Sequence, residues 1–300
     1  MSGPGGRQSA RSFSGESGEQ MMKPHISVCI PVYQGASTLA ATLRSVLASA
    51  RADFEVVIRD NGSTDGTSDV IAGFDDPRIR LIRSEGTLPL PANWCATVEQ
   101  ARGELIKVVC ADDLIHPDCL ATQATLLEDP SLALVACRRD FIDGNGRILT
   151  RNAGLPRLLG RRSVSEVARA TVRFGINPVG EPACAMFRRK DYDAIGGFDG
   201  SNVFVMDIDA WLRILTRGDM FGQPEAHAAF RMWTESFSNS HNRQQLGDHL
   251  RFLKQVADDP RYEIPTILRH LSPVAAHISW HAWTARQWLW SRKKSASRAS

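Results

Sequence analysis

The sequence predicts an α/β fold, a Rossmann-like and mostly parallel sheet covered by helices, followed by a helical C-terminal extension. Strand and helix patterns alternate four times within about ninety residues, which is typical of parallel strands joined by crossover helices. Two polar clusters, residues 60–66 and 111–113, each follow a predicted strand. Since such sheets bind ligands at the carboxyl ends of their strands, the element order and the placement of polar residues agree.

The first half of the chain supplies these elements in order. Apolar residues alternate over 26–30, as in a strand, and Pro31 is expected to end the run. Apolar residues at helical spacing predict a helix over 39–47, with Ser37 as its candidate N-cap. Further patterns predict strands at 54–58, 79–82 and 105–110, and a short helix at 94–101.

The second half is less regular. Residues 150–180 hold many arginines and one short predicted helix, 164–172. A strand is expected at 184–187, and residues 206–215 predict an amphipathic helix with its apolar side chains on one face. From Leu246 onward the pattern is helical, with breaks expected at Pro260, Pro265 and Pro273.

Composition narrows the classes of function. A net charge of +3 implies no strong field for nucleic acid, so we expect no nucleic-acid partner. The six cysteines form no C-x-x-C pair, which disfavours a zinc site or a disulfide framework and indicates a reducing compartment. No run reaches the ~18–20 apolar residues of a membrane span. Residues 1–22 lack a hydrophobic centre, so they predict a disordered leader instead of a signal peptide, and the protein is expected in the cytoplasm.

Two common nucleotide-binding signatures are missing from the sequence. No Gly-x-Gly-x-x-Gly follows the first predicted strand, and no Walker-type Gly-Lys-Ser/Thr occurs. A classical dinucleotide fold or a P-loop enzyme is therefore disfavoured.

Two adjacent acids, Asp112 and Asp113, follow the predicted strand that ends at Cys110. Neighbouring carboxylates repel each other and need a cation or hydrogen-bond donors. Mg²⁺ or Mn²⁺ bridging a diphosphate meets that need, because these ions prefer one or two carboxylates plus substrate phosphates. The structural alternative is a turn in which the acids cap the next helix.

Two further acidic segments have a similar double interpretation. Asp60 begins a loop in which Gly62 permits a positive φ. This loop is either a helix-capping turn or an edge that holds a ribose or base. Asp207 and Asp209 open a predicted helix, where acids interact favourably with the helix dipole. The functional alternative is a catalytic base directed into a cleft.

Four motifs occur in order along residues 23–240. The first is His25-Ile-Ser-Val-Cys-Ile-Pro-Val-Tyr33, and the second is Arg59-Asp-Asn-Gly-Ser-Thr-Asp-Gly66. The third is Gly103-Glu-Leu-Ile-Lys-Val-Val-Cys-Ala-Asp-Asp113. The fourth joins Gly196-Gly-Phe-Asp199 to Met206-Asp-Ile-Asp-Ala-Trp-Leu-Arg213. Together they resemble the first strand, second-strand loop, metal-binding strand and acceptor-side segment of the family 2 glycosyltransferases, which have the A-type fold.

The resemblance implies a donor side. Pro31 and Tyr33 would flank the base of a nucleotide-diphosphate sugar, and Asp60 would bond the base or ribose. Asp112 matches the last acid of the family's Asp-x-Asp and would hold Mn²⁺ or Mg²⁺, with Asp113 assisting. The catalytic domain would span residues 23–240, and residues 241–300 would be a helical extension with a basic tail.

The resemblance also implies an acceptor side. Asp207 matches the acid usually assigned as general base. It would deprotonate the acceptor hydroxyl as that oxygen attacks the anomeric carbon, and such direct displacement inverts the anomeric configuration. Gly197, Asp209 and Arg213 belong to the acceptor-side segment. The acceptor would be a glycan or a lipid-linked intermediate of cell-surface polysaccharide synthesis.

Four positions depart from the family's pattern. Cys110 stands where the first acid of Asp-x-Asp is common, and Asn61 replaces the second acid of the second-strand loop. Met206 replaces a common Glu, and Trp233 falls where many members have a His near the metal. Cys110 and Trp233 keep open the alternative of a catalytically silent nucleotide-sugar-binding module. A second alternative is a nucleotidyltransferase of sugar phosphates, since that class also uses Asp pairs with Mg²⁺ on a doubly wound sheet. The latter class normally carries a basic Gly-rich loop where this chain has Gln34-Gly-Ala-Ser.

Residues 274–290 contain four of the chain's seven tryptophans. Trp280, Trp283 and Trp290 are spaced near helical repeats, and cations such as Arg286 interleave with them or follow. Trp beside cations suits a membrane interface, which predicts peripheral contact of the C-terminal helix with the cytoplasmic membrane face. Packing of the same residues against the catalytic domain is the alternative.

Overall fold

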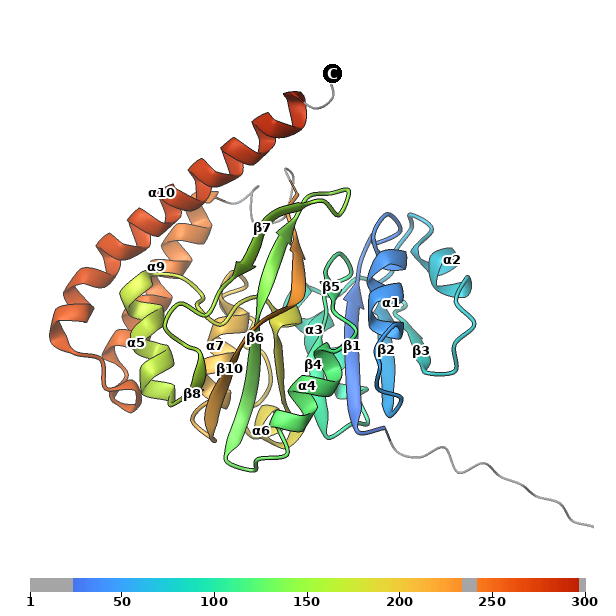
Figure 1. Cartoon of the computed structure of the whole chain (residues 1–300), viewed down its shortest axis with the longest axis horizontal. Coiled ribbons are helices and arrows are strands. Elements are labelled where there is room, and N and C mark those ends of the chain that lie inside the picture. Colours follow the sequence, from blue (N-terminus) through green and yellow to red (C-terminus); the bar gives the residue numbers. More distant parts are fainter. Residues whose placement is uncertain (1–23, 234–241, 297–300) are drawn as a thin grey trace, which may run out of the picture.

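The computed structural model describes residues 24–233 and 242–296. One sheet carries helices on both faces, and two long C-terminal helices lie along one side (Figure 1). The predicted leader, residues 1–22, lies outside the described residues. The strands are β1 (Ile26–Val32), β2 (Phe54–Asp60), β3 (Ile79–Arg83), β4 (Leu105–Val108), β5 (Leu114–Ile115), β6 (Leu132–Ile142), β7 (Ile148–Ala153), β8 (Gly160–Arg162), β9 (Ala185–Arg188) and β10 (Asp219–Arg231).

The helices follow the strands in the order expected of an α/β fold. They are α1 (Leu39–Leu47), α2 (Thr67–Ala72), α3 (Leu90–Glu99), α4 (Cys119–Leu126), α5 (Val164–Phe174), α6 (Arg189–Ala194), α7 (Met206–Ile214), α9 (Asn242–Asp258) and α10 (Thr266–Ala296), with short 3₁₀ turns η1 (Pro182–Cys184) and η2 (Pro260–Tyr262).

The sheet has the strand order β3-β2-β1-β4-β9-β6-β10-β5, with β7 beside β6 and β8 beside β10. The first four strands pair in parallel, as the alternating strand and helix patterns predict. Beyond them the pairing is mixed, because β9 runs antiparallel to both β4 and β6. β10 is parallel to β6, and β5 is antiparallel to β10. The Rossmann-like half therefore continues into a mixed half within one sheet.

Each face of the sheet has its own apolar core. In β1, Val28 and Ile30 belong to one core and Cys29 to the other, because successive side chains of a strand point to opposite faces. α1, α2 and α4 cover the first face, and α3, α5, α6, α7 and α9 contribute to the second. Trp211 of α7 is fully buried in the second core, which fixes the helix that carries Asp207.

Two boundaries near the N-terminus differ from the expectations. β1 continues through Pro31 to Val32 instead of ending at the proline. Its pairing with β4 stops at Cys29, so the N–H that Pro31 lacks is not needed on that side. The N-cap of α1 is Thr38 and not Ser37, and its side chain makes no capping bond.

Further along, the strand expected at 105–110 ends at Val108, and the helix expected at 94–101 begins at Leu90. Pro91 lies in the first turn of that helix, a position where its fixed φ and missing N–H suit the helix. The residues after Val108 are released into the turn that carries Asp112 and Asp113.

α10 passes through Pro273, where a break was expected. Pro273 has no N–H for the carbonyl of Arg269, and the Ser272 hydroxyl donates to that oxygen instead, at 3.2 Å. The breaks expected at Pro260 and Pro265 do occur, since both lie between α9 and α10.

The inner face of α10 packs on the C-terminal end of α5. A Cβ atom on Gly175 would lie 2.5 Å from the Ala276 Cα, so the two helices touch through their backbones. The Ser279 hydroxyl donates to the Phe174 carbonyl at 2.6 Å. None of the described helices is long and apolar enough to cross a membrane.

The indole rings of Trp283 and Trp290 contact the ring of Phe141 in β6, with centroid distances of 5.5 and 5.8 Å. The two indoles also meet edge to face at 6.0 Å. These two tryptophans therefore adopt the packed arrangement that the sequence left as an alternative. The boundary predicted at residues 240 and 241 falls outside the described residues.

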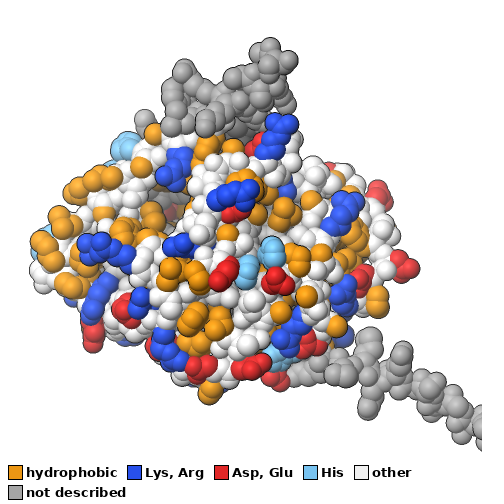
Figure 2. All heavy atoms as spheres, in the orientation of Figure 1, with side chains coloured by type: hydrophobic (Ala, Val, Ile, Leu, Met, Phe, Trp, Pro, Cys, Tyr) orange, Lys and Arg blue, Asp and Glu red, His pale blue; other side chains and the backbone are white. Residues whose placement is uncertain are grey.

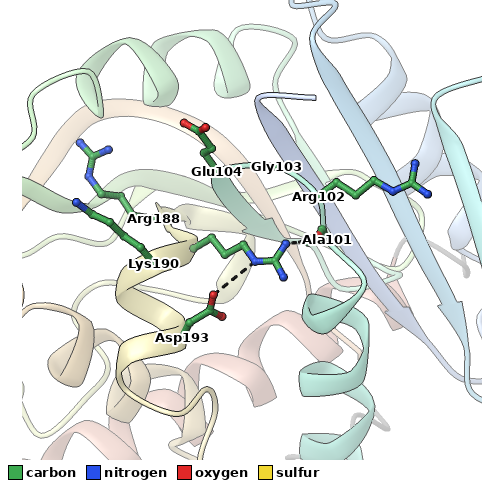
Figure 3. Close-up of a pocket in the computed structure, with 8 residues that line it drawn as sticks. Ala101, Arg102, Gly103, Glu104, Arg188, Lys190 and Asp193 are labelled. Atoms are coloured by element: carbon green, nitrogen blue, oxygen red, sulfur yellow. Dashed lines mark hydrogen bonds and ion pairs between the residues drawn. The ribbon is translucent and has the colours of Figure 1, made fainter. Parts of the chain in front are cut away.

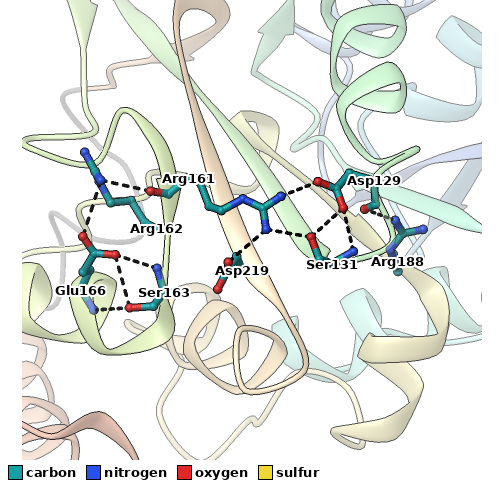
Figure 4. Close-up of polar contacts among 8 residues, drawn as sticks. All are labelled: Asp129, Ser131, Arg161, Arg162, Ser163, Glu166, Arg188 and Asp219. Atoms are coloured by element: carbon teal, nitrogen blue, oxygen red, sulfur yellow. Dashed lines mark hydrogen bonds and ion pairs between the residues drawn. The ribbon is translucent and has the colours of Figure 1, made fainter.

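Part of the arginine-rich segment has a structural role at the amino ends of β6 and β10. Arg161 of β8 joins both strands, and the neighbouring Arg162 pairs with Glu166 of α5 at 3.5 Å (Figure 4). Glu166 also closes a capping box with Ser163. The partners of Arg161 are Asp129, Ser131 and Asp219.

Candidate functional site

The turn between β4 and β5 carries the two adjacent acids, and it is held from both sides. The Thr42 hydroxyl of α1 lies 3.0 Å from the Ala111 carbonyl and 2.9 Å from the Asp113 carbonyl. From β10, Arg231 donates its backbone N–H to Asp113 Oδ1 at 3.2 Å and its Nε to the Asp112 carbonyl at 2.8 Å. The predicted metal-binding pair therefore stands on a turn fixed between α1 and β10.

Asp113 lies beneath the surface. Its side chain is 0% exposed, and its Oδ2 atom has no hydrogen-bond partner among the described residues. Burial, and next the charge of Asp112, raise the pKa of Asp113 well above its usual range. A buried carboxylate oxygen without a donor is satisfied by a proton or by a cation. The environment of Asp113 therefore fits a divalent ion beside the pair.

Asp112 is half-buried, and Trp233 donates its indole N–H to Asp112 Oδ2 at 3.0 Å. Burial raises the pKa of Asp112, whereas the bond from Trp233 lowers it. The residue that stands in place of the family's usual His is thus in direct contact with the predicted metal ligand. An indole donates a hydrogen bond but offers no lone pair to a metal.

No three His, Cys, Asp or Glu side chains of the described residues are grouped so that they could hold a metal ion. Magnesium and manganese sites commonly use one or two carboxylates and take their other oxygens from substrate phosphates and water. Asp112 and Asp113 match such a partial donor set.

Asp207 opens α7 and faces the same region. Its Oδ1 accepts from the Ile208 N–H at 2.7 Å, and its Oδ2 accepts from the Asn177 side chain at 2.9 Å. Asn177 is fixed in turn, because its Oδ1 accepts from the N–H groups of Val179 and Gly180 at 3.0 Å each. Burial raises the pKa of Asp207 to about 6. A carboxylate with this pKa is suited to accept a proton near neutral pH.

The acids of the site act on one another through their charges. The pKa of the Cys110 thiol lies well above its usual range because of burial and then the charges of four carboxylates. These carboxylates are Asp113, Asp112, Asp207 and Glu181. They come from segments that are distant in sequence, so the fold has brought the predicted base and the predicted metal pair to one place.

Sequence reasoning missed Glu181 and its partner Arg139. The Arg139 Nη2 donates to Glu181 Oε1 at 3.1 Å, and the guanidinium lies 5.1 Å from the ring centroid of Phe141. Its Nη1 fills a space next to Gly154 and Gly180, where a Cβ atom would lie 2.5 and 2.9 Å away. In the sequence, only the two glycines beside the arginine-rich segment hint that a large side chain packs there. The fold shows that this side chain is that of Arg139.

On the predicted donor side, the carboxylate of Asp60 is engaged by its own loop. Its Oδ1 accepts from the Ser63 N–H at 3.0 Å, and its Oδ2 accepts from the Ser68 hydroxyl at 2.9 Å. Pro31 is buried within β1, whereas Tyr33 is 54% exposed just after the strand. Of Pro31, Tyr33 and Asp60, Tyr33 is therefore the residue whose side chain is exposed for contact with a ligand.

The predicted acceptor-side residues form one connected unit. Arg213 bonds Asp209 Oδ2 at 2.7 Å, and its two terminal nitrogens donate to the carbonyls of Ile195 and Gly197 at 2.8 and 2.9 Å. A Cβ atom on Gly197 would lie 3.0 Å from the Tyr192 hydroxyl, and the residue has a φ of 80°. Arg213 thus fixes the glycine turn against α7, the helix that positions Asp207.

A surface pocket of about 800 Å³ lies elsewhere, at the amino end of β4 (Figure 3). It contains none of the predicted site residues. Two of its arginines are committed to backbone carbonyls, Arg188 to that of Leu132 at 2.8 Å and Arg189 to that of Ala101. Lining residues 101–104 precede β4, whereas Asp112 and Asp113 follow it, so the pocket and the acid pair lie at opposite ends of that strand.

Comparison with known proteins agrees with the family resemblance of the four sequence motifs. Residues 27–196 match the model of the family described as "Glycosyl transferase family 2". "Uncharacterized protein MT1568" of Mycobacterium tuberculosis is 31% identical over 278 residues, which covers 89% of this chain and 83% of that protein. The succinoglycan biosynthesis protein ExoO of Rhizobium meliloti is 29% identical over 126 residues, or 42% of this chain and 36% of that protein.

Solved structures share the fold. TarS of S. aureus, in a complex with UDP-GlcNAc, aligns with a TM-score of 0.61 at 14% identity over 84% of this chain and 71% of that chain. The mannosyltransferase PcManGT of Pyrobaculum calidifontis, in a complex with GDP-Man and Mn²⁺, aligns with a TM-score of 0.61 at 19% identity. That alignment covers 93% of this chain and 82% of the other.

Proposed function

Because the chain belongs to glycosyltransferase family 2 and is a glycosyltransferase, we propose that it moves a sugar from a nucleotide-diphosphate sugar to an acceptor hydroxyl with inversion of the anomeric configuration. The observation that carries this proposal is the half-buried carboxylate of Asp207, held by Asn177 beside the acid pair Asp112 and Asp113. A base close to a diphosphate-binding pair is what a direct displacement needs.

In the proposed reaction, the acceptor oxygen forms a bond to the anomeric carbon while its proton passes to the Asp207 carboxylate. The bond from that carbon to the diphosphate oxygen breaks, and the nucleoside diphosphate leaves with the electron pair. Asn177 keeps Asp207 Oδ2 in place. Arg213 and Asp209 orient the turn at Gly197 on the acceptor side.

Asp112 and Asp113 would hold a Mn²⁺ or Mg²⁺ ion, which when bound would neutralise charge on the departing diphosphate. The complex of PcManGT with Mn²⁺ supports this choice of ion, as does the buried Asp113 oxygen without a donor. On the donor side, Tyr33 would pack on the nucleotide base with its exposed ring, Pro31 would support it from β1, and Asp60 would shape the ribose edge.

The proposed acceptor is a growing glycan or a lipid-linked intermediate of cell-surface polysaccharide synthesis. A relative named for succinoglycan biosynthesis supports this class. We place the reaction in the cytoplasm at the face of the membrane, because all six cysteines are free thiols, as in proteins of reducing compartments. The C-terminal helix would provide the peripheral membrane contact.

The first test is a thermal-shift panel of UDP, GDP, dTDP and CMP with Mn²⁺ on the full chain. One nucleotide should raise the melting temperature, because a ligand of the native state stabilises it by RT ln(1 + [L]/Kd). The matching nucleotide sugar should then be hydrolysed slowly with Mn²⁺ and much more slowly without it.

The stereochemistry of transfer is the second readout. Proton NMR of the product should show the anomeric configuration opposite to that of the donor. A retained configuration would exclude Asp207 as the base of a direct displacement. Nucleotide binding without any hydrolysis or transfer would point instead to a catalytically silent module.

A further inference from the structure

The outer face of α10 carries an exposed aliphatic stripe. Ile267, Leu271, Val274 and Ile278 are 63%, 51%, 56% and 64% exposed, and they follow one another at intervals of four, three and four residues. Side chains at this spacing lie on one side of a helix. Exposed aliphatic residues are ordinary when scattered, but a contiguous line of them marks an interaction surface.

The stripe is distinct from the tryptophan face predicted from the sequence. Trp283 and Trp290 point inward against Phe141, and Ala276 and Ser279 contact the end of α5. α10 therefore uses its small and aromatic residues to hold the rest of the molecule. The aliphatic stripe stays on the side away from α5, where Figure 1 places α10 along the border of the molecule.

The charge on α10 has a single sign. The sequence from Thr266 to Ala296 contains no Asp or Glu. It contains Arg269 and Arg286, both exposed, and a basic run after Trp290, as well as three histidines. Figure 2 shows hydrophobic side chains interspersed with Lys and Arg over the region where α10 lies in Figure 1. An amphipathic basic helix of this kind matches an anionic lipid surface.

The same charges disfavour a second copy of the chain as the occupant. Heptad-like spacing also occurs in paired helices, but pairs are normally supported by opposite charges beside the seam. Two copies of α10 paired through the stripe would bring the three histidines of each helix near those of the other, with no acid on either helix to form a supporting ion pair. An anionic bilayer supplies both things that α10 lacks: negative charge from its headgroups, and an apolar environment for the aliphatic side chains.

We propose that the outer face of α10, with Ile267, Leu271, Val274 and Ile278 at its centre, binds an anionic lipid membrane in the plane of the interface. This deepens the proposed function, on which it rests, because a lipid-linked acceptor is presented at such a surface. The inward tryptophans anchor the helix to the sheet, while the outward aliphatic residues enter the lipid.

The test is co-sedimentation of the full chain with two kinds of vesicle: phosphatidylcholine alone, and an equimolar mixture of phosphatidylglycerol and phosphatidylcholine. Wild-type protein should sediment with the mixed vesicles and only weakly with the neutral ones. The double variant Leu271→Ser/Ile278→Ser should bind the mixed vesicles roughly tenfold to a hundredfold more weakly, because each aliphatic side chain transferred from water contributes up to about a tenfold factor. Arg286→Gln should reduce binding and its dependence on salt.

The matched control is Ile148→Ser, since Ile148 is 42% exposed but lies on β7. It should bind vesicles as the wild type does, and all variants should keep the wild-type melting temperature. Equal vesicle binding by wild type and the Leu271/Ile278 variant would overturn the proposal. So would a dimer, measured by light scattering, that becomes a monomer in that variant and does not bind lipid.

Donor hydrolysis in the absence of vesicles separates this proposal from the proposed function. The rate should be the same in wild type and in the stripe variants. Vesicle binding that depends on the stripe, in a protein that hydrolyses no nucleotide sugar, would support the membrane surface and contradict the proposed function. Hydrolysis without vesicle binding would do the reverse.

Discussion

The environment of Asp207 sets the pH dependence expected of the reaction. A general base must be ionised, and burial raises its pKa to about 6. The kcat/KM value should therefore fall as pH decreases through about 6 and level off above it. Asn177→Ala removes a donor to the carboxylate, so the acid limb should move to higher pH, while Asn177→Asp should not reproduce the wild-type profile. A flat profile between pH 5 and 8 would contradict the assignment.

The same residue should limit stability. Its folded-state pKa lies above its ordinary value of 3.8, so the native state binds a proton more tightly than the unfolded state. This contribution is complete below pH 3.8 and is lost as pH rises through 6. Asp207→Asn should therefore raise the free energy of unfolding by about 1–3 kcal/mol at pH 7.5 and leave it nearly unchanged at pH 4.

In the same Asp207→Asn variant, turnover should fall by ~10²–10⁴, while donor binding in the thermal-shift assay persists. Loss of donor affinity with turnover unchanged at saturation would make Asp207 a binding residue. Denaturant titrations at the two pH values provide the stability readout.

Asp112 and its indole partner give a second prediction. Asp112→Asn should abolish Mn²⁺-dependent nucleotide binding and transfer, because it removes one of two predicted carboxylate ligands, a loss of several kcal/mol of stabilisation. The fold should persist, since the turn is held mainly through the Asp112 and Asp113 backbone. Trp233→Phe is the comparison variant, because it keeps an aromatic ring but removes the N–H donated to Asp112 together with part of the indole. Wild-type Mn²⁺ dependence in Asp112→Asn would exclude the metal role.

The site was partly predictable at this scale. Asp112 and Asp207 each lie in a contiguous motif next to an element end, so their position follows from local pattern. Glu181 and Arg139 do not, because their pairing joins β6 to the segment before η1, and nothing local marks it. Asp60 was assigned a ligand role, and its carboxylate is engaged by loop donors, a local arrangement that the motif could not distinguish from a binding edge.

At the level of the elements, the contact between α5 and α10 leaves no space for an added side-chain atom at Gly175. Gly175 ends α5 with a φ of 59°, and a Cβ atom there would meet the Ala276 backbone at 2.5 Å. Gly175→Ala should therefore destabilise the protein by about 2–4 kcal/mol, from both backbone strain and overpacking.

Gly146→Ala is the control for that change. Gly146 has a φ of 82°, and a Cβ atom added to it would have no other atom within 4 Å, so the variant measures backbone strain alone, about 1–2 kcal/mol. Thermal melts of both variants make the comparison. Equal destabilisation would show that the helices separate easily and that their close contact contributes little.

The helices and strands that the sequence predicts well are those with a regular hydrophobic pattern. The parallel strands β1, β2 and β4 are short, buried apolar runs that local pattern identifies. β10 escaped prediction because Gly222 and Pro224 interrupt it, and its register with β6 shifts at three places. Such a strand shows no clean alternation. α10 seemed broken at Pro273 because a side-chain hydroxyl that replaces a lost donor cannot be seen in a hydropathy pattern.

For the whole molecule, the C-terminal helix is part of the folded body. A chain ending at Ser272 loses the contacts of Ala276, Ser279 and Trp283 with α5 and β6. Its melting temperature should fall steeply, since burial of one large aromatic side chain alone is worth about 3–5 kcal/mol. The Leu271→Ser/Ile278→Ser variant, changed only on the outer face, should melt with the wild type. A truncated chain that melts normally would contradict the packing.

The stack of rings behind the site limits how this enzyme can be recombined with its relatives. Trp283 and Trp290 lie on Phe141, Phe141 lies under Arg139, and Arg139 holds Glu181 among the acids of the proposed site. A chimera that imports a foreign C-terminal helix would leave Phe141 without its neighbours and disturb the acid cluster from behind. A chimera should therefore take α10, Arg139 and Phe141 together from the same relative if its acid cluster is to keep its arrangement.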